Sequence, residues 1–134
     1  MSGTHQGPGD KTLRTPDASQ IQVIRSYGRG HFQIGNTDWR CPVLVTPGAT
    51  SAWNVTRADQ VALEILALLA AAPARTEFLV LGCGPRALFI APATRAELKT
   101  AGFALEVVDT GSACRIYNVL LAEGRRVAAA LVPL

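Results

Sequence analysis

The densest group of chemically versatile side chains lies near the end of the chain, in DTGSACRIYN, residues 109–118. It combines an acid, hydroxyls, a thiol, a guanidinium, a phenol and an amide. Cys114 falls in the first turn of an expected helix, where the helix dipole can lower the pKa of a thiol and favour a nucleophilic thiolate. An active site in this stretch is therefore one interpretation. The entrance of an ordinary helix is the other.

A second cluster, LVLGCG, places Gly82, Cys83 and Gly84 directly after a short apolar run. Backbone N–H groups in such a turn can face a ligand at the carboxyl edge of a parallel sheet. The match to nucleotide-binding motifs is weak, because the third glycine of G-x-G-x-x-G and the lysine of a Walker loop are both absent. A tight turn that needs glycine is the favoured interpretation, and a phosphate or nucleotide site with an accessible Cys83 thiol is the alternative.

Neither Cys83 nor Cys114 has a general base beside it in the sequence, and His31 is the only histidine after residue 20. Free cysteine is also among the most commonly buried residue types, so we expect both thiols to be structural. Spacings typical of metal ligands, such as C-x-x-C or H-x-x-x-H, do not occur. We therefore assign no catalytic residue, no metal ligand and no cofactor.

Helical spacing sorts the residues around the first cluster. Asp109 and Thr110 are typical helix caps. In a helix over 112–123, Ala113, Ile116 and Leu120 would form the core-facing stripe, and Tyr117 and Asn118 would point to different faces. Helix capping does not account as well for the polar residues that follow, Arg115, Asn118, Glu123 and Arg125. The candidate binding pocket at the carboxyl edge accordingly comprises Gly82, Cys83, Gly84, Asp109, Thr110, Cys114, Arg115, Asn118, Glu123 and Arg125.

The first part of the chain, residues 21–45, alternates β-branched and aromatic residues with polar ones and is punctuated by glycines, which predicts short antiparallel strands joined by tight turns. Ile21, Val23 and Arg25 are expected to share one face of the first strand, and Phe32 and Ile34 one face of the second. Residues 43–45 are expected to form a third strand.

Helices and buried strands then alternate. Thr56 with Asp59, and Thr94 with Glu97, have the spacing of capping boxes and should open two helices, the first extending to Pro73. The runs EFLVLGCG, FALEVVD and RVAAALV predict strands buried on both faces. This order predicts an α/β fold of three layers, in which a central mixed sheet is flanked by helices and carries an added N-terminal β-hairpin.

Length and composition favour one soluble domain. The chain has 134 residues, 49% of them hydrophobic and 17% charged, with a formal net charge of +3. Residues 1–20 are expected to be a disordered lead-in, and 21–134 a single domain. We predict no nucleic-acid binding, because basic residues are not concentrated in one patch. No apolar run reaches the length of a membrane span, and the three cysteines fit a reduced, cytoplasmic, bacterial protein.

Several stretches, read together, resemble a family of small α/β domains that are largely uncharacterised: SYGRGHFQIG, Trp53, EFLVLGCG and LEVVDTGSACRIYNVLLAEGRRVAAALVPL. The family includes the mitochondrial respiratory complex I assembly factor 3 and an adipogenesis-associated animal protein, beside bacterial and archaeal members. The resemblance covers about residues 20–134, with D-T-x-x-A-C-x-x-Y-N as its most specific motif. It implies a three-layer fold but no reaction, and Cys83 replaces a threonine that many members carry.

Two functional hypotheses follow. The first is a non-enzymatic binding or assembly module with a protein partner, for which Trp39 and Trp53 could form an apolar patch if they are not packed in the core. The second is a small-molecule or enzymatic pocket at the carboxyl edge, near Gly82–Gly84 and Asp109–Arg115.

Overall fold

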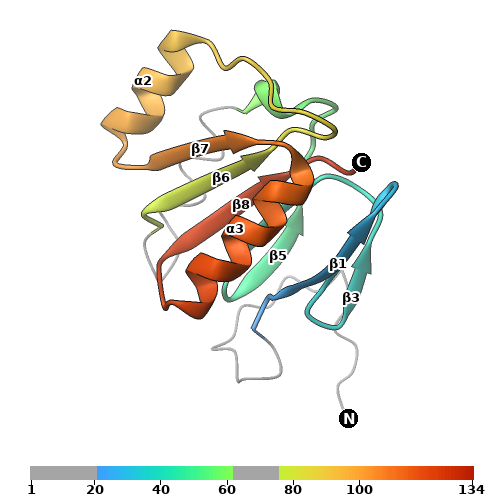
Figure 1. Cartoon of the computed structure of the whole chain (residues 1–134). Helices are drawn as coiled ribbons and strands as arrows, with labels where there is room; N and C mark the ends of the chain where they lie inside the picture. The colour runs from blue at the N-terminus through green and yellow to red at the C-terminus, as the bar shows by residue number, and fades with distance from the viewer. Residues whose placement is uncertain (1–20, 62–75) are drawn as a thin grey trace.

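A computed structural model describes residues 21–61 and 76–134. Its largest element is a mixed sheet of five strands in the order β5-β4-β8-β6-β7 (Figure 1). Strand β6 lies parallel to both of its neighbours, whereas β4 is antiparallel to β8 and to β5. The strands are β4 (Val43–Thr46), β5 (Ala49–Ala52), β6 (Phe78–Gly82), β7 (Ala104–Val108) and β8 (Val127–Leu131).

A separate antiparallel sheet of three strands precedes the main one, formed by β1 (Ile24–Gly28), β2 (His31–Ile34) and β3 (Thr37–Trp39). The expected hairpin is present, extended by β3. Residues 43–45 form the predicted strand, which is β4 of the main sheet, where it pairs with β8. One detail of the prediction was wrong, because β1 buries Ile24 while Arg25 is exposed. The pairing of β1 with β2 is irregular between Ile24 and Ser26, so the register shifts there. A shift of one residue exchanges the two faces of a strand.

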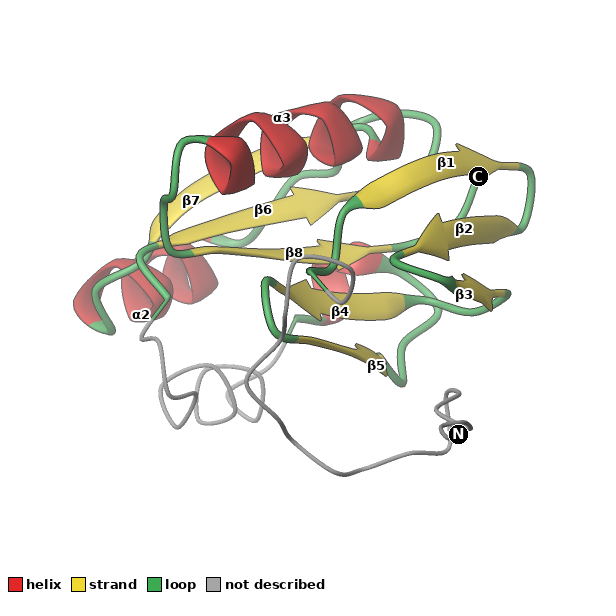
Figure 2. Cartoon of the chain, turned by 90° about the horizontal axis from the view of Figure 1, so that it is seen from below, coloured by secondary structure: helices red, strands yellow, loops and turns green. Residues whose placement is uncertain are grey.

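The helices complete the layers. Helix α3 (Thr110–Ala122) covers one face of the main sheet and contacts β1 (Figure 2). Helix α2 (Pro92–Thr100) packs on β7 from the opposite face, the side on which the 3₁₀ helix η1 (Ala58–Gln60) also lies. Most of the helix predicted to end at Pro73 lies outside the described residues, as does the N-terminal lead-in. Within the described ranges no helix is both long and apolar enough to cross a bilayer.

Alternating side chains of the central strands divide the core between the two faces. Leu79 and Leu81 of β6 face the α2 side, whereas Val80 faces the α3 side. The α2 side also buries Trp53, and the α3 side buries Trp39, Phe32 and Tyr117, so both tryptophans are packed in the core. The helix α3 stripe is centred on Cys114 and Tyr117, while the expected Ile116 and Leu120 are half-buried at its margin.

The predicted glycines mark the C-terminal ends of the helices correctly, whereas the predicted capping residues do not mark the starts of α2 and η1. Gly102 and Gly124, with φ of 98° and 76°, end α2 and α3 in the left-handed conformation that glycine adopts at low cost. Helix α2, however, begins at Pro92, so Thr94 lies inside its first turn. Before η1, the side chain that accepts the Thr56 and Arg57 N–H groups is Gln60, not Asp59.

Strand β7 also departs from the prediction. FALEVVD was expected to be buried on both faces, yet β7 is the edge strand of the main sheet, with Ala104 and Glu106 exposed and the other side chains half-buried. The strand RVAAALV, by contrast, is β8, whose five residues are all buried in the middle of the sheet.

Candidate functional site

The carboxyl ends of β6 and β7 meet at one edge of the sheet, because the two strands are parallel. The turn after β6 and the entrance of α3 are joined there by backbone hydrogen bonds. Cys83 N–H donates to the Val108 carbonyl and Thr110 N–H donates to the Gly84 carbonyl, each at 2.9 Å. The structure thus brings together the two clusters that the sequence singled out.

Thr110 is the central polar residue of this edge and is fully buried. Its hydroxyl accepts from Gly84 N–H at 2.7 Å and donates to the Val132 carbonyl at 2.6 Å. One hydroxyl therefore connects α3, the turn after β6 and the segment after β8. The prediction that Thr110 is a cap was wrong, because the hydroxyl bonds to distant backbone groups rather than to its own helix.

Gly82 is required by close packing rather than by its backbone conformation. A Cβ atom built there would lie 2.8 Å from Leu131 Cδ2, 3.0 Å from Ala113 Cβ and 3.2 Å from Thr110 Cα. A Cβ atom this close to its neighbours would force them to move. Gly84 has φ of 93°, so the turn itself also favours glycine. Both glycines of the turn therefore have structural explanations.

Asp109 is the N-cap of α3, as predicted. Its carboxylate accepts from Ser112 N–H at 3.0 Å and from the Ser112 hydroxyl at 2.6 Å. These bonds lower the pKa of Asp109 below its usual value, the side-chain bond most strongly. Arg115 continues the chain of contacts, since it donates to the Ser112 hydroxyl and, at 2.9 Å, to the Tyr27 hydroxyl of β1.

Both thiols near this edge are buried. Cys83 is 6% exposed and Cys114 is 1% exposed. Burial raises the pKa of both thiols, that of Cys114 to about 12, because the thiolate loses its hydration. For Cys114 this desolvation outweighs the helix dipole that the sequence suggested could activate it. At neutral pH both residues are thiols, as the structural interpretation expects.

The remaining candidates lie elsewhere. Asn118 is half-way along α3, where its side chain is bonded to the backbone of Ile24 in β1. Glu123 and Arg125 lie at the opposite end of α3, and the Arg125 guanidinium stacks 4.6 Å from the centre of the Phe78 ring. Of the predicted pocket, residues 82–84, 109, 110, 114 and 115 are therefore grouped together, and 118, 123 and 125 are not.

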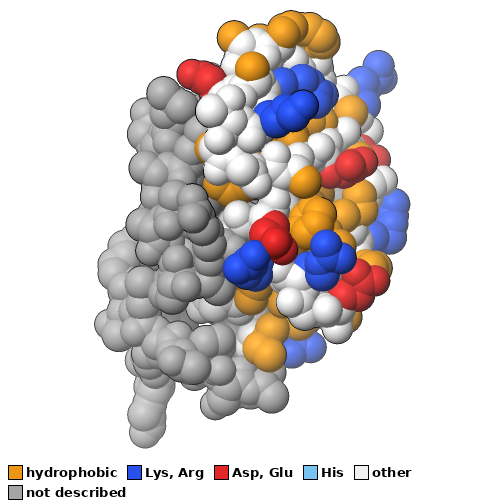
Figure 3. Space-filling view, turned by 90° about the vertical axis from the view of Figure 1, so that its left-hand side faces the viewer, with side chains coloured by type: hydrophobic (Ala, Val, Ile, Leu, Met, Phe, Trp, Pro, Cys, Tyr) orange, Lys and Arg blue, Asp and Glu red, His pale blue; other side chains and the backbone are white. Residues whose placement is uncertain are grey.

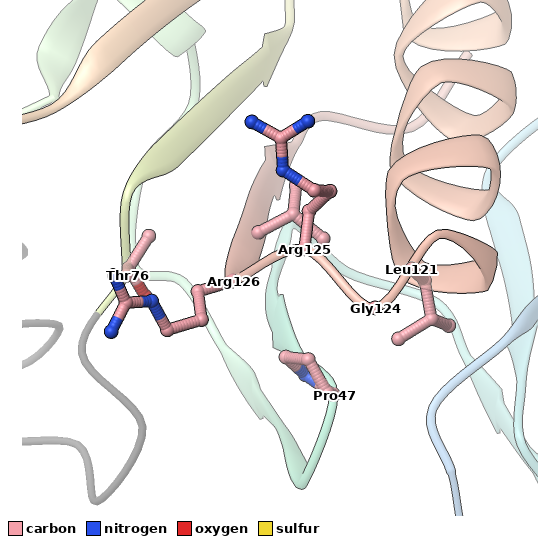
Figure 4. Close-up of a pocket in the computed structure, with 7 residues that line it drawn as sticks. Pro47, Thr76, Leu121, Gly124, Arg125 and Arg126 are labelled. Carbon is pink, nitrogen blue, oxygen red and sulfur yellow. The ribbon is translucent and has the colours of Figure 1, made fainter.

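The described residues also line two surface cavities that lie away from the carboxyl edge. One, of about 220 Å³, lies at the end of α3 and includes Pro47, Leu121, Arg125 and Arg126 in its lining. In Figure 4 its two arginine side chains point in different directions, and Arg126 extends toward Thr76. Arg126 also pairs with Glu77 at 2.7 Å. The two cations do not converge on one position, so this cavity lacks the geometry of an anion site.

The other cavity, of about 390 Å³, is a groove between α3 and the edge of the sheet. Its lining is formed by Phe78 and Val80 of β6, Ala104, Leu105 and Glu106 of β7, and Ile116 and Leu120 of α3. Sequence reasoning missed it because these residues were assigned to a buried strand and to a core stripe. The signal that could have found it is Glu106, a charge inside an otherwise apolar strand.

Comparisons with known proteins agree with this architecture. A family model described as protein of unknown function (DUF498/DUF598) matches residues 24–132. The chain is 38% identical to NADH dehydrogenase (ubiquinone) 1 alpha subcomplex assembly factor 3 of Danio rerio over 122 residues, which are 91% of this chain and 70% of that protein. It is 34% identical to an uncharacterised protein of Rhodobacter capsulatus, with 90% of this chain and 92% of that protein covered.

A solved structure shows the same fold. The crystal structure of a Bordetella parapertussis protein superposes with a TM-score of 0.75 at 31% identity, covering 88% of this chain and 100% of that one. Sequence and fold agree over nearly all of the described residues, so the chain belongs to the DUF498/DUF598 family, which includes the assembly factor 3 proteins.

Proposed function

We propose that this protein is a non-enzymatic binding module that holds a protein partner, as the name of its Danio rerio relative suggests for an assembly factor. The observation that carries the proposal is that the carboxyl-edge residues have structural roles. Thr110 links three backbone segments, Asp109 caps α3, and the Cys83 and Cys114 thiols are buried. The groups that suggested chemistry therefore hold the fold together.

The surface supports the same proposal. Phe89 and Val119 are 80% and 56% exposed, and the groove beside α3 has a mostly apolar lining. Exposed apolar surface rimmed by polar side chains is typical of protein-binding sites. Figure 3 shows hydrophobic side chains lying among acidic and basic ones on the side of the molecule where the parallel strands begin.

Affinity purification of the tagged protein at native expression tests this function. We expect one partner to be recovered in a stoichiometric amount. Failure to recover any such partner across several growth conditions would overturn the proposal.

A thermal-shift screen against nucleotides and metabolites addresses a ligand pocket at the carboxyl edge. A ligand at 100 times its dissociation constant would stabilise the fold by about 2.7 kcal/mol. We expect no shift of that size. A clear shift, abolished by Thr110→Val but kept by Thr110→Ser, would favour the pocket instead.

A further inference from the structure

The outer edge of β7 has backbone groups that face away from the sheet. Ala104 N–H donates to the Glu77 carbonyl at 2.8 Å, and the Val108 carbonyl accepts from Cys83 N–H at 2.9 Å, so both residues direct their backbone groups toward β6. Backbone direction alternates along a strand, which places Leu105 and Val107 the other way. Their N–H and C=O groups face the open side, where no described strand pairs with β7.

The two faces of β7 differ: among the described residues, one packs into the core and the other borders the groove. The Leu105 and Val107 side chains pack against the core cluster on the α2 side, which also contains Leu98 of α2. Ala104 and Glu106 point to the α3 side, where they form one border of the groove. Partner side chains that follow the same alternation would enter this groove from an added strand.

Glu106 decides what kind of strand fits. An antiparallel strand that used all four outward groups of Leu105 and Val107 would be centred on Glu106, in a pair where side chains approach most closely. A second copy of β7 in that register would place Glu106 against Glu106, and like charges directly opposite each other are destabilising. A basic side chain at that position would instead be attracted.

We propose that β7 binds an extended segment of a protein partner as a sixth, antiparallel strand of the main sheet. The segment carries Lys or Arg opposite Glu106 and, two residues later, a large apolar side chain opposite Ala104. That side chain enters the groove and contacts Ile116, Leu120 and Phe78. The inference rests on the proposed binding function and adds the surface and the chemistry of the partner.

The direct probe is a synthetic heptapeptide, Thr-Val-Thr-Lys-Thr-Leu-Thr, with blocked ends, titrated into the full-length protein labelled with ¹⁵N. In antiparallel register its lysine lies opposite Glu106 and its leucine opposite Ala104. We expect saturable shifts of the amide signals of residues 104–108, and slower hydrogen exchange at Leu105 and Val107. No change at these residues at millimolar peptide would overturn the proposal, and Glu106 would then serve only to protect the edge from aggregation.

A charge exchange tests the pairing itself. A control peptide with glutamate in place of the lysine should bind the native protein about threefold or more weakly. Glu106→Lys should reverse this preference, whereas Glu97→Lys, the same charge change on an exposed position of α2, should leave it unchanged. An equal preference in the native protein and in Glu106→Lys would contradict the proposed register.

Purification of tagged variants separates this inference from the proposed function. If the native chain and Glu97→Lys recover a stoichiometric partner and Glu106→Lys loses it, β7 is the binding edge. If Glu106→Lys recovers the partner equally well, the binding function stands and the β7 site is wrong. If the native chain recovers no partner, the proposed function itself fails, and with it the β7 proposal.

Discussion

The Asn118 side chain is hydrogen-bonded to both backbone groups of Ile24. Its Oδ1 accepts from Ile24 N–H at 3.0 Å and its Nδ2 donates to the Ile24 carbonyl at 2.8 Å. The side-chain amide thus occupies the place that a neighbouring strand would take beside β1. The adjacent Tyr117 adds a second contact between α3 and this part of the chain, because its hydroxyl donates to the Gln22 carbonyl at 2.8 Å. These contacts attach the small sheet to α3.

Asn118→Ala should therefore destabilise the fold, although Asn118 was a candidate site residue. The substitution leaves the Ile24 N–H and carbonyl without these partners, which costs about 1–3 kcal/mol. Urea denaturation followed by circular dichroism measures the change. Val119→Ala, next to it on the exposed side of α3, should change the free energy of unfolding by no more than about 0.5 kcal/mol. Equal stability of the two variants would contradict the attachment role.

Gly82→Ala should also destabilise the protein, because the added Cβ would press on Ala113 Cβ and the Thr110 backbone. Overpacking of this kind costs about 1–3 kcal/mol. Gly28→Ala is a matched control, since its Cβ would approach His31 Cε1 at 2.8 Å, the same distance as from the Gly82 Cβ to Leu131 Cδ2. The His31 ring can rotate away, whereas a helix backbone cannot. Unfolding midpoints that fall equally for both variants would show that crowding at Gly82 is not special.

The three cysteines should differ in reactivity. A thiol with a pKa of about 12 is a thiolate in only about one molecule in ten thousand at pH 8, so Cys114 should resist iodoacetamide in the folded protein. Burial also protects Cys83, whereas Cys41 is only half-buried. Peptide mass spectrometry should find Cys41 labelled first, and all three labelled in urea. Rapid labelling of Cys114 without urea would reopen the nucleophile interpretation.

Asp109 should make stability depend on pH in the acid range. Its pKa in the folded state is lowered, first by the bond from the Ser112 hydroxyl, so the ionised form stabilises the fold. That contribution is present above the ordinary value of 3.8 and is lost as the pH falls through the lowered pKa. Asp109→Asn should therefore be less stable than the native protein at pH 7 and 5.

Denaturation at lower pH checks the sign of this effect. The difference between Asp109→Asn and the native protein should begin to shrink below pH 3.8, where the unfolded-state carboxyl takes up its proton, and should vanish below the lowered pKa of the folded state, where both side chains are neutral. Asp59 and Glu77 also have lowered pKa values, but they are present in both proteins, so their contributions to the pH dependence cancel in the comparison. A stability difference that stays constant down to pH 2 would mean that the charge of Asp109 does not contribute.

Local patterns predicted the elements of the C-terminal half well. The apolar runs before Gly82 and after Arg126 became β6 and β8, and the segment between Asp109 and Gly124 became α3. These signals are local, since a strand or helix is recorded in the periodicity of its own side chains. The resemblance to the family likewise depended on sequence alone, and the family match confirmed it.

Position within the sheet was not predictable in the same way. FALEVVD and RVAAALV look similar as sequences, yet β7 is at the edge and β8 is in the centre. Strand order depends on pairing between segments far apart in the chain, which no local pattern records. The same cause made the Thr110 hydroxyl a link between distant backbone groups instead of a cap.

The amino-acid sequence therefore specified the helices and strands that follow residue 76, and it placed Asp109 and Thr110 at the start of α3. Tertiary packing decided what those residues do. It surrounded Cys114 with apolar side chains, directed Asn118 to the backbone of β1 and left Glu106 on an open edge, because burial and hydrogen-bond partners are supplied by neighbours that lie far away in the chain.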